Sequence, residues 1–155
     1  MRVLLLPVAL LLSQAAYAGE RAIPTTSLPA AVQAAIASGY PGATIREAST
    51  EIEDGATEYE AEIALGERTV DLAYSADGGL LEEEEIVSLA STPPAVEAAL
   101  AAYTGWTIGR VERAIAGGAT TYEAELTKGK KRVEVAMSAE GVLRGKEQAE
   151  HDEGR

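Results

Sequence analysis

The chain has 155 residues, with 25 acidic and 13 basic side chains, a net charge of −12 and no cysteine. This charge argues against nucleic acid and anionic lipid as partners, and favours solubility, a basic partner or a cation. Without cysteine there is no disulfide, no thiol nucleophile and no lipid attached through an N-terminal cysteine.

Residues 1–18 have the pattern of a secretory signal peptide. Met1-Arg2 is a basic start, Val3 to Leu12 is apolar apart from Pro7, and Ala16-Tyr17-Ala18 supplies the small residues that a signal peptidase reads. The apolar run is shorter than the about 20 residues that span a bilayer, so a cleaved signal is favoured over an anchor. We expect cleavage after Ala18 and a periplasmic or secreted protein with no stable membrane anchor.

One stretch of the sequence occurs twice, 63 residues apart. Gly55 to Glu62 (GATEYEAE) returns as Gly118 to Glu125 (GATTYEAE), and Ser75 to Gly78 (SADG) returns as Ser138 to Gly141 (SAEG). Self-similarity at a fixed period indicates a supersecondary unit used twice. The predicted organisation is a tether at 19–27, repeats at 28–87 and 92–147, and a disordered tail at 148–155.

In the first repeat, the pattern predicts a helix followed by four strands. Leu28, Val32, Ala35 and Ile36 lie on one helical face, which opens at a cap-like Ser27 and ends at the Gly and Pro residues of 38–42. Residues 43–53 fit a helix or a bulged strand, and the strand is favoured. Alternation then predicts strands at about 58–65, 69–74 and 80–87, separated by glycine turns.

The second repeat follows the same order. Thr92-Pro93-Pro94 opens a helix with Val96, Leu100 and Tyr103 in its apolar stripe, and strands are expected at about 106–115, 121–128, 131–138 and 142–146. The predicted fold class is α+β, with two tandem repeats of a helix plus a four-stranded antiparallel meander. One continuous sheet with the helices on one face is a possible arrangement of the pair.

Three short motifs carry a family resemblance: Leu-Pro-x-x-Val from Leu28, Tyr-Pro-Gly-Ala from Tyr40, and Gly-x-x-x-Tyr-Glu-x-Glu from Gly55. They resemble the PepSY-like modules of exported bacterial proteins, which are related in shape to the beta-lactamase-inhibitor protein (BLIP) fold. The resemblance covers about residues 27–147 and implies a helix packed on a four-stranded antiparallel sheet. Family members include inhibitory propeptide modules and a protein inhibitor of beta-lactamase. None of their contact residues can be placed on this chain, and the second repeat departs from the pattern at Thr104-Gly105-Trp106.

The sequence offers little for catalysis. Its only imidazole is His151, in the predicted tail, so a Ser–His pair would lack a positioned base. There is no Gly-rich phosphate loop, His pair or Cys cluster to begin a nucleotide or zinc site. We therefore predict a protein that is not an enzyme, with no catalytic residue, cofactor or metal site.

Acidic residues recur on the predicted solvent faces of the strands. The simplest interpretation is a solvated sheet face, paired across strands with Arg68 or with Lys130, Lys131 and Arg132. The alternative is an acidic surface that docks a partner, and Trp106 is either a core residue or part of that surface. The candidate surface consists of Glu58, Glu60, Glu62, Asp71, Trp106, Glu123, Glu125, Arg132 and Glu134.

Glu82 to Glu85 form the densest run of charge. Four consecutive acids on a strand alternate between faces and cannot all reach one ion, and no EF-hand loop is present. Protection of an edge strand from aggregation is the simpler explanation.

The preferred function is an exported, non-catalytic protein-binding module, with inhibition of an enzyme as one form of it. The alternatives are an acidic cation-binding or envelope-stress module and a structural or scaffolding protein. The expected partner is a protein rather than nucleic acid, and the sequence does not fix the oligomeric state.

Overall fold

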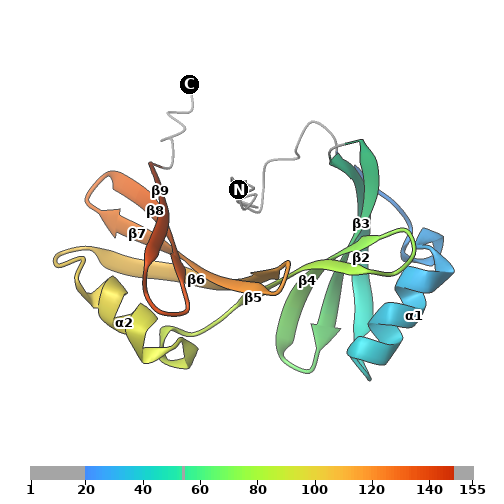
Figure 1. Ribbon diagram of the computed structural model, residues 1–155, viewed down its shortest axis with the longest axis horizontal. Helices are drawn as coiled ribbons and strands as arrows, with labels where there is room; N and C mark the ends of the chain where they lie inside the picture. Colours follow the sequence, from blue (N-terminus) through green and yellow to red (C-terminus); the bar gives the residue numbers. More distant parts are fainter. Residues whose placement is uncertain (1–19, 54, 149–155) are drawn as a thin grey trace, which may run out of the picture.

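The computed structural model describes residues 20–53 and 55–148. Within them the chain forms two α-helices and one nine-stranded antiparallel sheet, whose strands neighbour each other in sequence order. Figure 1 shows the sheet as an arch with the helices at its two ends. The elements are α1 (Ala30–Gly39), α2 (Pro94–Ala101), β1 (Arg21–Ala22), β2 (Thr44–Glu53), β3 (Ala56–Leu65), β4 (Arg68–Ser75), β5 (Leu80–Ile86), β6 (Thr107–Ala116), β7 (Ala119–Lys128), β8 (Lys131–Ser138) and β9 (Leu143–Gln148). The predicted repeats therefore do join into one sheet, whereas the predicted signal peptide and residues 149–155 of the tail lie outside the described residues.

Both helices bury the face that their apolar spacing predicts. Val32 and Ile36 of α1 are buried, as are Val96 and Leu100 of α2. The predicted Ser27 cap is wrong: the residue before α1 is Pro29, and no side chain caps the helix. Ser27 instead ends a 3-10 turn at Thr25–Ser27, so its side chain lies too early in the chain to reach the first turn of α1.

The predicted bulge is present in both repeats. The pairing of β2 with β3 shifts between Ile45 and Glu47, and that of β6 with β7 shifts between Ile108 and Val111. An extra residue on one strand changes which face the following side chains occupy. This explains why the apolar spacing in this stretch looked helical as well as extended.

A single row of directly paired residues crosses the sheet through both repeats. It runs Ile45–Ile63–Val70–Glu85–Arg113–Tyr122–Met137, from β2 to β8. Directly opposed residues of antiparallel strands project to the same face. The hydrophobic clusters under α1 and α2 therefore lie on the same face of the sheet, here called the helix face. The opposite side is called the helix-free face.

Strand β1 occupies beside β2 the place that β5 occupies beside β6. The amide of Ile23 donates to the carbonyl of Ala48 at 2.9 Å, and the amide of Val87 donates to the carbonyl of Val111 at 2.9 Å. Ala48 and Val111 are repeat equivalents, 63 residues apart. The segment predicted as a tether thus contains a short strand and a 3-10 turn that attach it to the sheet.

The recurring SADG and SAEG motifs form the β4–β5 and β8–β9 turns, which pack against the helices. A Cβ at Gly78 would lie 2.7 Å from the carbonyl oxygen of Ala31 in α1, and one at Gly141 would lie 2.4 Å from that of Ala95 in α2. Both glycines also have positive φ, +86° and +74°. Only glycine satisfies both conditions without strain, which explains why the motif recurs.

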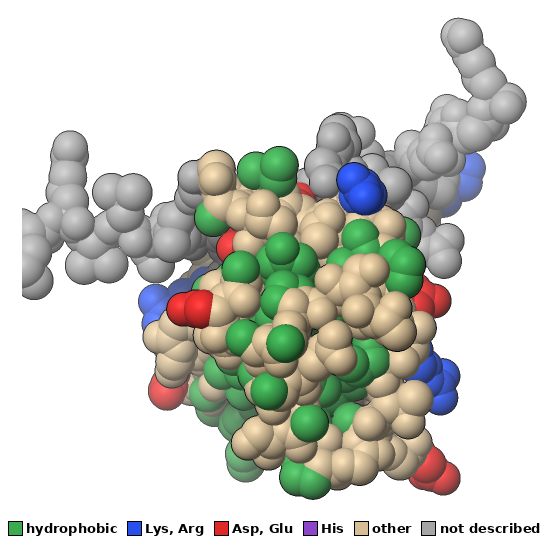
Figure 2. Space-filling model, turned by 90° about the vertical axis from the view of Figure 1, so that its right-hand side faces the viewer, with side chains coloured by type: hydrophobic (Ala, Val, Ile, Leu, Met, Phe, Trp, Pro, Cys, Tyr) green, Lys and Arg blue, Asp and Glu red, His purple; other side chains and the backbone are tan. Residues whose placement is uncertain are grey.

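The end of the molecule seen in Figure 2 is largely uncharged. Hydrophobic and neutral side chains fill the centre of this view, and the acidic and basic ones lie toward its margins. Helix α1, at this end in Figure 1, contains no charged residue. The acidic residues of the first repeat are therefore concentrated on its strands and turns.

Candidate docking face

Four carboxylates form a line across four neighbouring strands of the helix-free face. Glu47 of β2 is opposite Glu62 of β3, Glu62 is opposite Asp71 of β4, and Asp71 is opposite Glu84 of β5. Directly opposed side chains on a sheet have Cβ atoms only about 5 Å apart, and like charges at that distance repel. The fold therefore brings together acids that are distant in sequence, without a base between them in the row.

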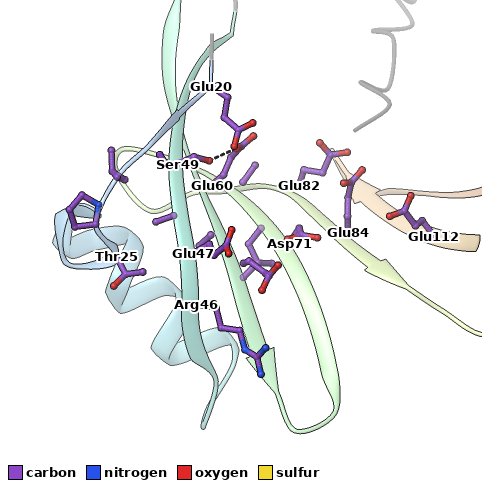
Figure 3. A pocket seen from close by; sticks show the side chains of 18 of the residues that line it. Glu20, Thr25, Arg46, Glu47, Ser49, Glu60, Asp71, Glu82, Glu84 and Glu112 are labelled. Carbon is purple, nitrogen blue, oxygen red and sulfur yellow. Dashed lines mark hydrogen bonds between the residues drawn. The ribbon is translucent and has the colours of Figure 1, made fainter. Parts of the chain in front are cut away.

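These carboxylates line an open groove of about 650 Å³. Figure 3 shows Glu47, Glu60, Asp71, Glu82 and Glu84 along it, contributed by β2, β3, β4 and β5. Glu20 and Thr25 also line the groove, as do Arg46 of β2 and, from the second repeat, Arg110 and Glu112 of β6. We call this surface the acidic groove.

Several carboxyl groups in the acidic groove hold their protons more tightly than usual. Burial, followed by the negative charges of Glu82, Glu123 and Asp71, raises the pKa of Glu84 to about 8. The pKa values of Asp71 and Glu82 are raised first by burial and then by neighbouring carboxylates.

Glu60 accepts a hydrogen bond within the acidic groove. Burial raises its pKa, while the hydroxyl of Ser49, which donates to its carboxylate at 2.5 Å, lowers it. A cation that approaches clustered acids with raised pKa values stabilises their ionised forms, because it relieves their mutual repulsion.

The two repeats differ strongly in charge. Residues 28–87 contain fourteen acidic and two basic side chains, whereas residues 92–147 contain seven and eight. On the helix-free face of the second repeat, Arg132 forms an ion pair with Glu125, and Arg110 forms one with Glu112. The negative potential of this face is therefore concentrated in the first repeat.

Eight of the nine predicted surface residues lie on the helix-free face, but they form two groups. Glu58, Glu60, Glu62 and Asp71 belong to the first repeat, while Glu123, Glu125, Arg132 and Glu134 lie on β7 and β8 of the second. Trp106 is separate from both, because it packs against the hydrophobic cluster under α2. The core interpretation of Trp106 agrees with this position.

The predicted pairing of Arg68 with the acids of β3 is wrong. Arg68 is two residues before Val70 and projects to the helix face, where its guanidinium binds Glu85 at 2.6 and 2.8 Å. It therefore lies on the opposite side of the sheet from Glu60 and Glu62. The predicted pairing of Arg132 with an acid of β7 is confirmed by its ion pair with Glu125.

The run from Glu82 to Glu85 has a different role from the one predicted. It does not protect an edge, because β5 is paired with β4 on one side and β6 on the other. The predicted alternation is confirmed: Glu82 and Glu84 line the acidic groove, while Glu83 and Glu85 accept hydrogen bonds on the helix face. Within residues 20–53 and 55–148, no group of three acidic or histidine side chains is arranged to hold a metal ion.

Sequence reasoning missed Glu47, Glu82 and Glu84 as members of the acidic surface. The bulge hid the face of Glu47, and the position of β5 at the centre of a continuous sheet was needed to place the other two. The sequence did contain one signal for Glu82 and Glu84: in a strand they alternate with Glu83 and Glu85, so the two pairs must lie on opposite faces.

The fold and the repeat define a known class of protein. A family model described as "Putative beta-lactamase-inhibitor-like, PepSY-like" matches residues 17–82 and again residues 81–145. The chain belongs to this family, as the resemblance of its motifs predicted. A search of curated proteins found no match. None of the helices in the described part of the chain is both long and apolar enough to cross a membrane.

Solved structures with the same fold come from Bacteroides species. A BLIP-like protein from Bacteroides fragilis is 25% identical with a TM-score of 0.65, and the match covers 86% of this chain and 93% of that one. A protein from Bacteroides eggerthii, described as a putative periplasmic protein, is 17% identical with a TM-score of 0.65, over 77% and 88% of the two chains. A DUF2874 family protein from Bacteroides uniformis is 19% identical with a TM-score of 0.65, over 77% and 88%.

Proposed function

We propose that the protein is an exported, non-catalytic protein-binding module that docks a basic surface of its partner on the acidic groove. The observation that carries this proposal is the line of four carboxylates from Glu47 to Glu84 across four strands. Burial and like-charge repulsion disfavour full ionisation of this line, and a cationic partner would favour it on binding. Export rests on the signal-peptide pattern of residues 1–18.

The form of this function that the family description supports is inhibition of an enzyme. A rigid sheet face offers a preorganised surface, and a partner's lysine or arginine side chains would enter the groove over the helix-free face of the sheet. Complementary charge would steer the encounter and make it salt-dependent. The partner is thus defined by its chemistry, as a protein with a basic protrusion.

The test compares three versions of the chain from Gly19 as baits for the envelope fraction of the source organism. They are the wild type, a groove variant (Glu62→Gln with Asp71→Asn) and a matched control (Glu67→Gln with Glu97→Gln) that removes the same charge elsewhere. We expect one partner to bind the wild type and the control, to elute with salt, and to be lost from the groove variant. Because the groove variant removes mutual repulsion, its fold should be at least as stable as the wild type.

Two outcomes would contradict the proposal. Equal retention of the partner by all three baits would place the docking surface outside the acidic groove. Retention that requires calcium and disappears with a chelator would favour the cation-binding alternative. Once a partner is identified, inhibition is tested by its activity with increasing amounts of the wild type and the groove variant.

A further inference from the structure

The two halves of the molecule do not share a hydrophobic core. The buried residues of the first cluster fall between Leu28 and Tyr74, those of the second fall between Val96 and Met137, and no residue belongs to both. Between the clusters, the row that crosses the helix face changes from Val70 to the charged pair Glu85–Arg113. Charged side chains thus occupy the place where a continuous core would otherwise connect the halves.

The charged groups at this junction form a connected network. Arg113 Nη2 donates to Glu83 Oε1 at 2.8 Å and to Glu85 Oε2 at 3.0 Å, which links β6 to two positions of β5. Arg68 of β4 donates to both oxygens of Glu85, and the hydroxyl of Tyr40, just after α1, donates to Glu83 Oε2 at 2.5 Å. The side chains of Glu83 and Glu85 are only 16% and 10% exposed.

The protonation states favour a permanent network at neutral pH. Hydrogen bonds from Arg68 lower the pKa of Glu85, so its carboxylate stays ionised. Burial, together with the hydrogen bond to Glu83, raises the pKa of Tyr40, so its hydroxyl remains a donor. Ion pairs that are largely withdrawn from water are also screened less by salt than exposed ones.

The backbone link between the halves is short. The pairing of β5 with β6 runs from Glu82–Ala116 to Ile86–Glu112 and is followed by the bond from the amide of Val87 to the carbonyl of Val111, whereas β3 pairs with β4 from Glu58–Ser75 to Leu65–Arg68. A short ladder permits twisting and bending that a second set of contacts can restrict. On the helix face of this ladder, Glu83, Glu85 and Arg113 belong to the charged network, and Ile115 lies opposite Glu83.

We propose that Glu83, Glu85, Arg113, Arg68 and Tyr40 form an ionic latch that fixes the angle between the two halves. The latch also determines the far wall of the acidic groove, since Arg110 and Glu112 of β6 line a groove otherwise built from the first half. Arg113 is its central residue, because its guanidinium, on β6, binds two carboxylates of β5. The latch acts whether or not the groove binds a partner.

The experiment measures the angle directly with spin labels. The natural chain has no cysteine, so Glu67→Cys and Lys130→Cys, in equivalent turns of the two halves, give one defined pair of labels. Pulsed electron spin resonance should give a narrow distance distribution for the otherwise wild-type protein. Arg113→Met should at least double the width of that distribution, while Arg132→Met, which breaks the ion pair with Glu125 within the second half, should leave it unchanged.

Unfolding supplies a second measurement. In the wild type, Trp106 fluorescence, which reports the second half, and far-UV circular dichroism should give the same urea midpoint. With Arg113→Met the two midpoints should separate, because the halves are no longer coupled. If Arg113→Met does not fold, the double variant Glu83→Gln, Glu85→Gln removes the ion pairs of Arg113, and that of Arg68 with Glu85, while keeping side-chain shape, and it should broaden the distances in the same way. A narrow distribution and coincident midpoints in a folded latch variant would overturn the proposal.

Discussion

Glu84 lies at the meeting point of the two halves on the helix-free face. It is opposite Asp71 of β4 and Ala114 of β6, and only the charge of Arg110 opposes the carboxylates that raise its pKa. In the unfolded chain the same carboxyl ionises near its ordinary pKa of 4.5. The folded state therefore binds more protons than the unfolded state between about pH 4.5 and 8.

This difference sets the direction of the pH dependence. The stabilisation from a protonated Glu84 is fully present below pH 4.5 and is lost as the pH rises through about 8. Asp71, Glu60 and Glu82 contribute in the same direction, since their pKa values are also raised. Glu85 has a lowered pKa, so its contribution is lost only on acidification.

We predict that the melting temperature falls between pH 6 and pH 9, and that Glu84→Gln removes the larger part of this fall. At pH 9 the variant should melt at least about 3 °C above the wild type, the shift that about 1 kcal/mol produces in a chain of this size. Scanning calorimetry at four pH values measures it. Glu97→Gln on α2, which also removes one acid, is the control, and an unchanged slope in Glu84→Gln would refute the prediction.

At the residue scale, sequence patterns assigned most side chains to the correct face but did not identify their neighbours. Alternation placed Glu60 and Glu62 on the solvent side of β3, as observed. It could not show that Arg68 would bind Glu85 rather than those acids, because that choice depends on which strand follows β4 in the sheet. Local periodicity determines the face, whereas pairing across strands determines the partner.

At the scale of elements, the turn between β4 and β5 packs closely against the backbone of α1. Gly78 brings this turn against the first turn of α1, and Gly141 does the same for α2. At Gly66, in the β3–β4 turn, φ is also positive, but a Cβ would meet nothing within 4 Å. A comparison of Gly78 with Gly66 therefore separates the cost of the positive φ from the cost of steric contact with the helix.

We predict that Gly78→Ala destabilises the fold by about 1–3 kcal/mol more than Gly66→Ala. Both substitutions incur the roughly 1–2 kcal/mol cost of a left-handed conformation, but only the first also drives a methyl group into the carbonyl of Ala31. Urea unfolding followed by circular dichroism gives both values. Equal losses would show that the turn moves away from α1 without cost.

Most elements could be predicted because each repeat supports the same interpretation twice. The two helices and eight of the nine strands follow from apolar spacing and glycine turns, including the bulged strands. Strand β1 was not predicted, because two residues carry no periodicity and the strand exists only through its pairing with Ser49 and Thr50. An element of that length is determined by its neighbour rather than by its own residues.

The whole molecule consists of two cores on one sheet, and its cooperativity depends on the junction between them. Val32 of α1 and Val96 of α2 are both fully buried, and Trp106 packs against the second cluster. If the ladder and the latch couple the halves, a defect in the first core will lower the stability of the second. The fluorescence of Trp106, in the second half, can therefore detect the effect of a defect in the first core.

We predict that Val32→Ala lowers the unfolding free energy seen by Trp106 fluorescence by about 2 kcal/mol, as much as Val96→Ala does. The equality is expected because one cooperative transition includes both cores. Urea titrations of the two variants and the wild type measure it. A normal Trp106 transition in Val32→Ala would mean that the halves unfold separately even with an intact latch.

At the scale of the whole molecule, the repeat predicted two units but not how they join. The sequence allowed separate sheets or one, because the charged run at Glu82–Glu85 fits an edge strand as well as a central one. The acidic groove depends on that choice, since Glu84 reaches its neighbours only when β5 is internal.

The equivalence of β1 and β5 allows the charges at the junction to be compared with those at the outer strands. The position of Glu83 on β5 corresponds to Lys146 on β9, and that of Arg113 on β6 corresponds to Thr50 on β2. The outer strands therefore lack the opposite charges that join β5 to β6, and β1 already occupies part of the edge of β2. A strand placed beside β9 would meet Lys146 at the position where β6 meets Glu83. The charged positions that join β5 to β6 are therefore specific to this junction rather than part of the repeat.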